Sequence, residues 1–181
     1  MVGTTIPYQI VILTQQHSIR GEIFLHDERL SDYLNDRRQK NIVLRNASVA
    51  RLESPGEVLE NTLVSILPKA GIMLAYEPPQ KTGTFPPRFI KYPKDKYAVF
   101  LILDGMEVHG EIHTTGSLDL LKILADSGDS FLPITQATVT IEANPNLLLR
   151  SAAVMVNIQR IRLIGELEPK TQTEPIQQPP I

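Results

Sequence analysis

The chain has 181 residues, 42% of them hydrophobic, and a formal net charge of −2 at pH 7. It contains no cysteine, which excludes disulfides, thiolate metal sites and thiol chemistry. No apolar stretch reaches the roughly 20 residues that a membrane-spanning helix needs. The N-terminus also lacks the basic start and apolar core of a signal peptide. We therefore expect a soluble, cytoplasmic protein.

An internal repeat organises the sequence. Ser18–Ile23 reads S-I-R-G-E-I and Met106–Ile112 reads M-E-V-H-G-E-I, each after a run of apolar residues. Further matches extend the repeat on both sides: Tyr8 with Tyr97, Gly21 with Gly110, Ala47 with Ala137, Pro55 with Pro145, and Val64 with Val154. The offset is 89 residues at the glycines and 90 at the alanines, which indicates one inserted residue near the middle. Such a repeat predicts two units of similar fold.

The repeat sets the expected domain boundaries. We predict a first unit over residues 1–77, a linker over 78–96, a second unit over 97–167 and a tail over 168–181. The linker is rich in proline and basic residues, which is typical of an extended connection. The tail is rich in Pro, Gln and Thr, a composition that predicts disorder, although it could also serve as a tether or a peptide ligand.

In chain order, the sequence of each unit predicts two strands, a short helix and three further strands. Alternation of apolar and polar residues in Ser18–Leu25 is typical of a half-buried strand. Apolar residues at helical spacing predict a helix in Arg29–Arg38, and Ser117 is the expected N-cap of its counterpart. The strands expected in the first unit are Ile10–Leu13, Ser18–Leu25, Ile42–Leu52, Val58–Leu67 and Ile72–Tyr76. Those expected in the second are Tyr97–Ile102, Met106–Ile112, Phe131–Ile141, Leu147–Val156 and Ile161–Leu167.

Two features predict the shape of the sheet. Glycine within a strand is costly unless the backbone bends or another segment approaches closely, so Gly21 and Gly110 predict a sharply curved second strand in each unit. Ser54-Pro55-Gly56 and Asn144-Pro145-Asn146 predict turns before the fourth strand of each unit. The sequence therefore predicts a mainly β protein built from two tandem small β-barrels of the SH3 or Sm kind, each carrying one helix.

The first unit resembles the Sm-like family at several positions. An apolar strand at Ile10–Leu13 precedes Gly21, and Asp27 and Asn41 follow before the apolar residues of the third strand. The apolar rhythm of Val154–Ile161 is similar to the second signature of that family. Asn157-Ile158, and Leu67-Pro68 in the first unit, stand where the family has the Arg-Gly pair that contacts RNA, and Ser130 stands at the Asn41 position. The helix also lies after the second strand rather than before the first. The resemblance implies a barrel of similar shape and association through strand edges, without the RNA contacts of the family. The repeats also look like small bacterial proteins of unknown function.

Candidate chemistry is sparse. Glu107, His109, Glu111 and His113 share one face of a strand, but the first unit has no matching ligands, so we interpret this row as a solvated face. No phosphate-binding loop or nucleophile motif is present. We therefore predict no catalytic residue, no cofactor and no metal site.

Positive charge gathers in two places. Arg37, Arg38, Lys40 and Arg45 follow the first helix, and the linker adds Arg88, Lys91 and Lys94 beside aromatic residues. Such a combination suits single-stranded nucleic acid, although cations at a helix end and in a linker are also common on ordinary surfaces. We expect a non-catalytic protein-interaction or assembly module that binds a protein partner or itself. The alternative is a nucleic-acid-binding regulator that uses these seven residues.

Overall fold

A computed structural model describes residues 6–26, 28–78, 94–126, 128 and 130–168. The first half of the chain contains β1 (Ile6–Leu13), β2 (His17–Leu25), α1 (Leu30–Asn35), β3 (Asn41–Arg51), β4 (Val58–Pro68), a 3-10 turn (Lys69–Gly71) and β5 (Leu74–Tyr76). The second half contains β6 (Asp95–Leu103), β7 (Met106–Thr114), α2 (Leu120–Asp126), β8 (Phe131–Ile141), β9 (Asn144–Asn157), a 3-10 turn (Ile158–Arg160) and β10 (Ile161–Glu166). The expected order of elements is confirmed in both halves. Most of the linker and tail lies outside the described residues.

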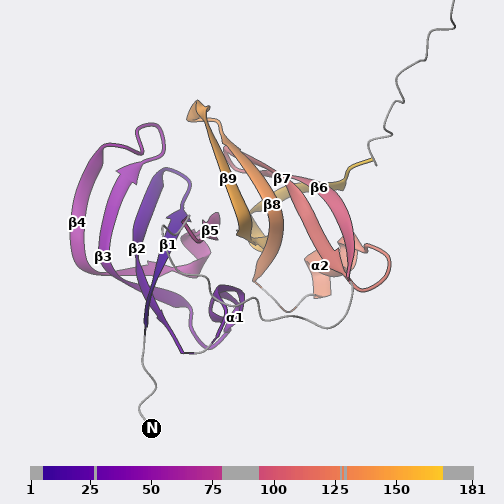
Figure 1. The fold of residues 1–181 in the computed structure, drawn as a ribbon, viewed down its shortest axis with the longest axis horizontal. Helices are drawn as coiled ribbons and strands as arrows, with labels where there is room; N and C mark the ends of the chain where they lie inside the picture. Colours follow the sequence, from indigo (N-terminus) through magenta and orange to yellow (C-terminus); the bar gives the residue numbers. More distant parts are fainter. Residues whose placement is uncertain (1–5, 27, 79–93, 127, 129, 169–181) are drawn as a thin grey trace, which may run out of the picture.

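The strands form one sheet rather than two closed barrels. Ten antiparallel strands follow the order β10-β6-β7-β8-β9-β5-β1-β2-β3-β4, so the described sheet is open, with β10 at one edge and β4 at the other. Figure 1 shows β1–β4 grouped on one side, β6–β9 on the other, and β5 between the two groups. The coarse prediction of a mainly β protein is confirmed. The described strands do not close because β5 pairs with β1 and with β9, and β4 pairs with β3 alone. Among the described residues, no helix is long and apolar enough to cross a membrane.

Gly21 and Gly110 lie at irregularities of the sheet where a neighbouring strand approaches closely. The pairing of β2 with β3 shifts register at Gly21, and that of β7 with β8 shifts at Gly110. A Cβ atom added at Gly110 would lie 2.6 Å from the carbonyl oxygen of Thr135, so the neighbouring strand approaches too closely for any side chain. The opposing strands carry Asn46 and Gln136 with φ of 48° and 49°, which marks the same irregularity in both halves.

Three local predictions are wrong. Ser117 does not cap α2, because the helix begins at Leu120 and the carboxylate of Asp119 accepts a hydrogen bond from the Lys122 backbone N–H at 3.0 Å. The segment Asn144-Pro145-Asn146 is not a turn but the start of β9. Pro145 is tolerated there because it lies within a register shift, where its missing N–H costs no ladder hydrogen bond.

The third correction concerns the offset between the halves. Ala47 faces Thr62 and Ala137 faces Ser151, so β4 and β9 correspond at an offset of 89 rather than 90. The two 3-10 turns, at Lys69–Gly71 and Ile158–Arg160, keep the same offset of 89. Val154 therefore matches Ser65, not Val64. The extra residue before β8 is compensated between β8 and β9, where a short hairpin replaces the longer turn of the first half.

Two hydrophobic clusters cover opposite faces of the sheet, and each draws on both halves. Ile10 and Ile12 of β1 pack with Phe131 and Met155 of the second half. Val11 and Leu13, which alternate with them, pack with Val99 and Val154 of the second half. Because successive side chains of a strand point to opposite faces, β1 is buried on both sides. This explains why its sequence is continuously apolar rather than alternating.

Candidate functional site

The basic residues that follow α1 mostly have partners within the molecule. Arg38 lies 90% exposed and forms a two-pronged ion pair with Asp36, with Nε–Oδ1 and Nη2–Oδ2 distances of 2.9 Å. Hydrogen bonds from Arg38 lower the pKa of the Asp36 carboxyl to about 2. Arg37 donates a hydrogen bond from Nε to the carbonyl oxygen of Gly128, in the loop that precedes β8. The guanidinium carbon of Arg45 lies 5.7 Å from the centre of the Phe24 ring, in reach of a cation–π contact.

The remaining predicted cations are less informative. Lys40 and Lys94 are exposed. Arg88 and Lys91 lie outside the described residues. In the first cluster, Arg37, Arg38 and Arg45 therefore contact groups of the same chain, and the extension of the cluster into the linker stays a prediction.

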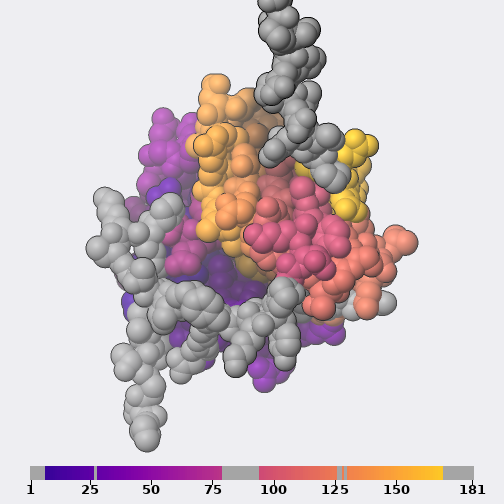
Figure 2. All heavy atoms as spheres, turned by 45° about the vertical axis from the view of Figure 1, so that its right-hand side comes forward, coloured from indigo at the N-terminus to yellow at the C-terminus, as the bar shows by residue number. Residues whose placement is uncertain are grey.

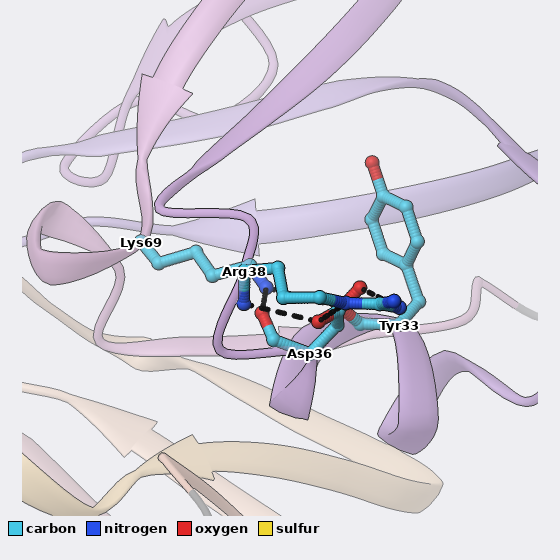
Figure 3. A network of polar contacts seen from close by, with 4 residues as sticks. All are labelled: Tyr33, Asp36, Arg38 and Lys69. Atoms are coloured by element: carbon cyan, nitrogen blue, oxygen red, sulfur yellow. Dashed lines mark hydrogen bonds and ion pairs between the residues drawn. The ribbon is translucent and has the colours of Figure 1, made fainter.

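One cation of this region was missed by sequence reasoning. Lys69 is buried at 8% exposure, and its Nζ donates hydrogen bonds of 3.0 Å to the carbonyl oxygens of Tyr33 and Asp36. Figure 3 shows its side chain reaching from the turn after β4 to the end of α1. Burial lowers the pKa of this ammonium, an effect opposed by the Asp36 carboxylate. Its bonds satisfy carbonyls that the helix end would otherwise leave unpaired. Because a lone lysine in a turn carries no sequence signal, only the fold reveals this role.

The Glu–His row on β7 has local partners. His113 Nε2 lies 2.8 Å from the Thr135 hydroxyl, and the His109 ring lies 4.6 Å from the Phe100 ring. Glu111 contacts His113 at 3.6 Å and Lys96 at 3.8 Å. Within the described ranges, no group of three His, Asp or Glu side chains is placed to hold a metal ion.

A groove of about 990 Å³ runs between the two halves. Its lining carries charges of both signs and includes Arg29, Glu77, His113 and Arg150. On one wall the Tyr8 hydroxyl donates a 2.8 Å hydrogen bond to Glu77, and burial together with this bond raises the Tyr8 pKa. Lys94, in the described end of the predicted linker, also lines the groove. The described charged residues of the lining are the cations Arg29, Lys94 and Arg150 and the carboxylate Glu77, together with His113, and we assign the groove no chemistry.

The outer strand β4 is the most unusual surface feature. On its outer side, this 11-residue strand pairs with no other strand of the described sheet. Apolar side chains cluster on it in the open: Leu63 is 82% exposed and Ile66 is 69% exposed, with Val58, Leu59 and Val64 about half exposed. We call Val58–Pro68 the β4 edge. Its sequence, V-L-E-N-T-L-V-S-I-L-P, predicts a strand, but only the strand order shows that no other described strand pairs with its outer side.

No family model matches the chain, and no curated protein and no solved structure matches it.

Proposed function

We propose that the chain is a non-catalytic protein-interaction module whose β4 edge receives an extended strand of a protein partner. One observation carries the proposal: a long edge strand whose outer side pairs with no other described strand and which exposes large apolar side chains. An open strand edge presents a row of unpaired N–H and C=O groups that can pair with another strand. Addition of a strand to a sheet edge is a recurring mode of protein recognition.

The composition of the β4 edge is more typical of a strand that binds a partner than of an edge strand that is protected against pairing. Exposed edge strands usually carry charges, prolines or bulges that prevent pairing. Between Asn61 and Leu67 the β4 edge has no charged residue and no proline. Full burial of a side chain such as Ile66 contributes about 1.5–3 kcal/mol. Two or three such burials, added to backbone hydrogen bonds, would therefore favour binding of a partner strand and offset part of the cost of association.

The five strands of each half also support, as part of this proposal, an Sm-like or SH3-like relationship, although each helix follows the second strand rather than preceding the first. In that interpretation each half is an incomplete small barrel of five strands with a 3-10 turn before the fifth. The relationship adds no activity to the proposal, because neither Asn157-Ile158 nor its counterpart at the offset of 89, Pro68-Lys69, is the Arg-Gly pair that contacts RNA in that family.

Photo-crosslinking tests the role of the β4 edge. A benzophenone amino acid replaces Val64, and the same replacement at Leu121, an exposed apolar residue of the helix α2, is the matched control. We expect one identifiable protein to be captured at Val64, to be lost when Ile66→Asp is added, and to bind again when both proteins are purified. Equal capture at Val64 and Leu121 would overturn the proposal.

The nucleic-acid alternative has weaker support. Arg37, Arg38 and Arg45 each engage a group of the same chain, which lowers their availability for phosphates. Fluorescence anisotropy with a labelled single-stranded RNA pool tests it at low and moderate salt. Salt-sensitive binding that is lost in Arg37→Glu/Arg38→Glu would favour the alternative. We expect no binding at moderate salt.

A further inference from the structure

The pairing of β5 with β9 joins the two halves. Leu74 faces Val156, Ala75 faces Met155 and Tyr76 faces Val154. Around this pairing, the second half completes the core of the first, because Met155 and Phe131 lie in the cluster built on β1. The Asn157 side chain adds hydrogen bonds from Nδ2 to the carbonyl oxygens of Lys69 and Ile72, at 3.2 and 2.9 Å. The fourth strand of one half thus docks on the fifth strand of the other.

The two edge strands of the sheet, β10 and β4, are the repeat counterparts of the two junction strands, β5 and β9. β10 corresponds to β5, because Leu74 faces Leu13 just as Leu163 faces Ile102 at the offset of 89. β4 corresponds to β9 at the same offset. The described sheet therefore has the fifth strand of the second half at one edge and the fourth strand of the first half at the other. The junction pairs a fifth strand, β5, with a fourth strand, β9, so the two edges are of the two kinds that pair with each other there.

Exposure differs at matched positions in a way that follows from these free edges. Met155 is 5% exposed in the junction, whereas its counterpart Ile66 is 69% exposed. Leu74 is fully buried, and its counterpart Leu163 is 48% exposed.

The helices show the same contrast. Leu34, the fifth residue of α1, is 1% exposed, whereas Leu124, the fifth residue of α2, is 40% exposed. In β1, Val11 and Leu13 are buried, but their counterparts Phe100 and Ile102 in β6 are only partly covered. In Figure 2 the yellow atoms of β10 lie at the side of the molecule away from the first half. Positions that the first half buries against the second have counterparts in the second half that are only partly covered by the described residues.

From these equivalences we propose that a second copy of this chain places its β10 on the β4 edge and repeats the internal junction between molecules. The expected register pairs Leu163 with Leu67, Ile164 with Ile66 and Gly165 with Ser65 of the next copy. This inference rests on the proposed role of the β4 edge and names its partner. Because the two surfaces differ, the contact is head-to-tail and builds a ring if the rotation closes or an open chain if it does not.

The contact between molecules is weaker than the internal junction. Asn41 replaces Phe131 at the start of the third strand, and Pro68 replaces Asn157, so an aromatic anchor and the amide hydrogen bonds are lost. Gly71 replaces Arg160, whose Nε donates a 3.0 Å hydrogen bond to the Ala70 carbonyl across the junction. Assembly therefore depends on protein concentration, unlike the covalently linked halves.

Disulfide trapping tests the register. The chain has no cysteine of its own. Ser65→Cys and Gly165→Cys are made in separate full-length proteins and mixed under oxidising conditions. A Cβ atom at Gly165 meets no atom within 4 Å, so this variant is expected to fold, which circular dichroism checks. We expect a covalent dimer in the mixture and none in either protein alone.

The matched control keeps the strand and changes the register. Asn61 is exposed on β4, four residues from Ser65, which is about 13 Å along a strand and beyond the roughly 7 Å reach of a disulfide. Asn61→Cys mixed with Gly165→Cys is expected to lose the covalent dimer. A dimer in Ser65→Cys alone, or equal trapping at Asn61 and Ser65, would overturn the head-to-tail register.

Sedimentation of the cysteine-free protein provides the second measurement. We expect the average mass to rise with concentration in the parent and to stay monomeric in Ile66→Asp. A strict monomer at high concentration, with no trapping at Ser65, would overturn self-association. If the benzophenone at Val64 still captured a different protein, the proposed function would stand while this inference fails. If Val64 captured nothing, both would fail.

Discussion

Replacement of Gly110 by alanine tests whether the close strand approach in β7 is essential. The added methyl group would overlap the Ile134 side chain and lie 2.6 Å from the Thr135 carbonyl oxygen, a backbone atom that cannot rotate away. Overpacking of this kind typically costs about 1–3 kcal/mol. For a chain of this size, each kcal/mol lowers Tm by roughly 2–4 °C. We therefore expect Gly110→Ala to melt about 2–12 °C below the parent in a circular dichroism melt.

A graded pair of controls makes the Gly110→Ala prediction specific. At Gly21 the added methyl group would meet the Ala47 side chain at 3.1 Å and the Arg45 carbonyl oxygen at 3.2 Å, a milder overlap. At Gly165, also within a strand, it would meet nothing within 4 Å. The expected order of destabilisation is Gly110→Ala, then Gly21→Ala, then Gly165→Ala, the last being near neutral. Equal melting temperatures for Gly110→Ala and Gly165→Ala would refute the reasoning.

Three further substitutions have expected outcomes. The folded pKa of Asp36 is lowered from 3.8 to about 2, so its stabilising effect is present above pH 4 and is lost as pH falls towards 2; melts over this range should fall more steeply for the parent than for Asp36→Asn. The folded pKa of Tyr8 is raised above 10, so the stability that it contributes is lost as pH rises beyond 10; Tyr8→Phe should show a smaller loss between pH 9 and 11, and an identical loss would contradict this. Asn35 accepts hydrogen bonds from the backbone N–H groups of Ser130 and Phe131 at 2.9 and 2.8 Å and donates one to the Phe131 carbonyl at 3.0 Å. Asn35→Ala should therefore cost about 1–3 kcal/mol for each buried group left unpaired, measured by urea unfolding against the exposed control Asn61→Ala.

Much of the local structure could be predicted because its signals are local. The alternation in Ser18–Leu25, and the repeat that makes Phe131–Ile141 the counterpart of the third strand, predicted strands whose observed bounds agree to within one residue or fully. The mid-strand glycines predicted a bend or a close approach of another segment, and the structure has register shifts and a close strand approach at both positions. The errors at Ser117 and Asn144 arose where neighbouring residues suit the same local position. Asp119 caps α2 in place of Ser117, and the turn comes before Asn144 because β9 begins at that residue.

Pairing between distant strands could not be predicted in the same way. Nothing in the sequence of Leu74–Tyr76 distinguishes a strand that closes its own barrel from one that bridges two halves. The difference depends on whether β4 or β9 lies against it, a choice between segments of similar apolar pattern. The offset of 90 at Val64 and Val154 was plausible by identity, yet the ladder of hydrogen bonds fixes 89. Lys69 shows the same limit, because its role depends on the end of a helix 33 residues away in sequence.

The apolar run of β1 shows how the junction and the free edges are linked. A strand covered on one face needs only alternate apolar residues, but Ile10–Leu13 is apolar at every position because both clusters reach it. Its counterpart in β6, Val99–Ile102, is equally continuous in sequence, yet Phe100 and Ile102 are only partly covered. The second half thus carries a pattern suited to burial on both faces while the described molecule covers one. A neighbour on the outer side of β6 and β10 would account for this pattern, and the β4 edge is the surface of this chain that matches it.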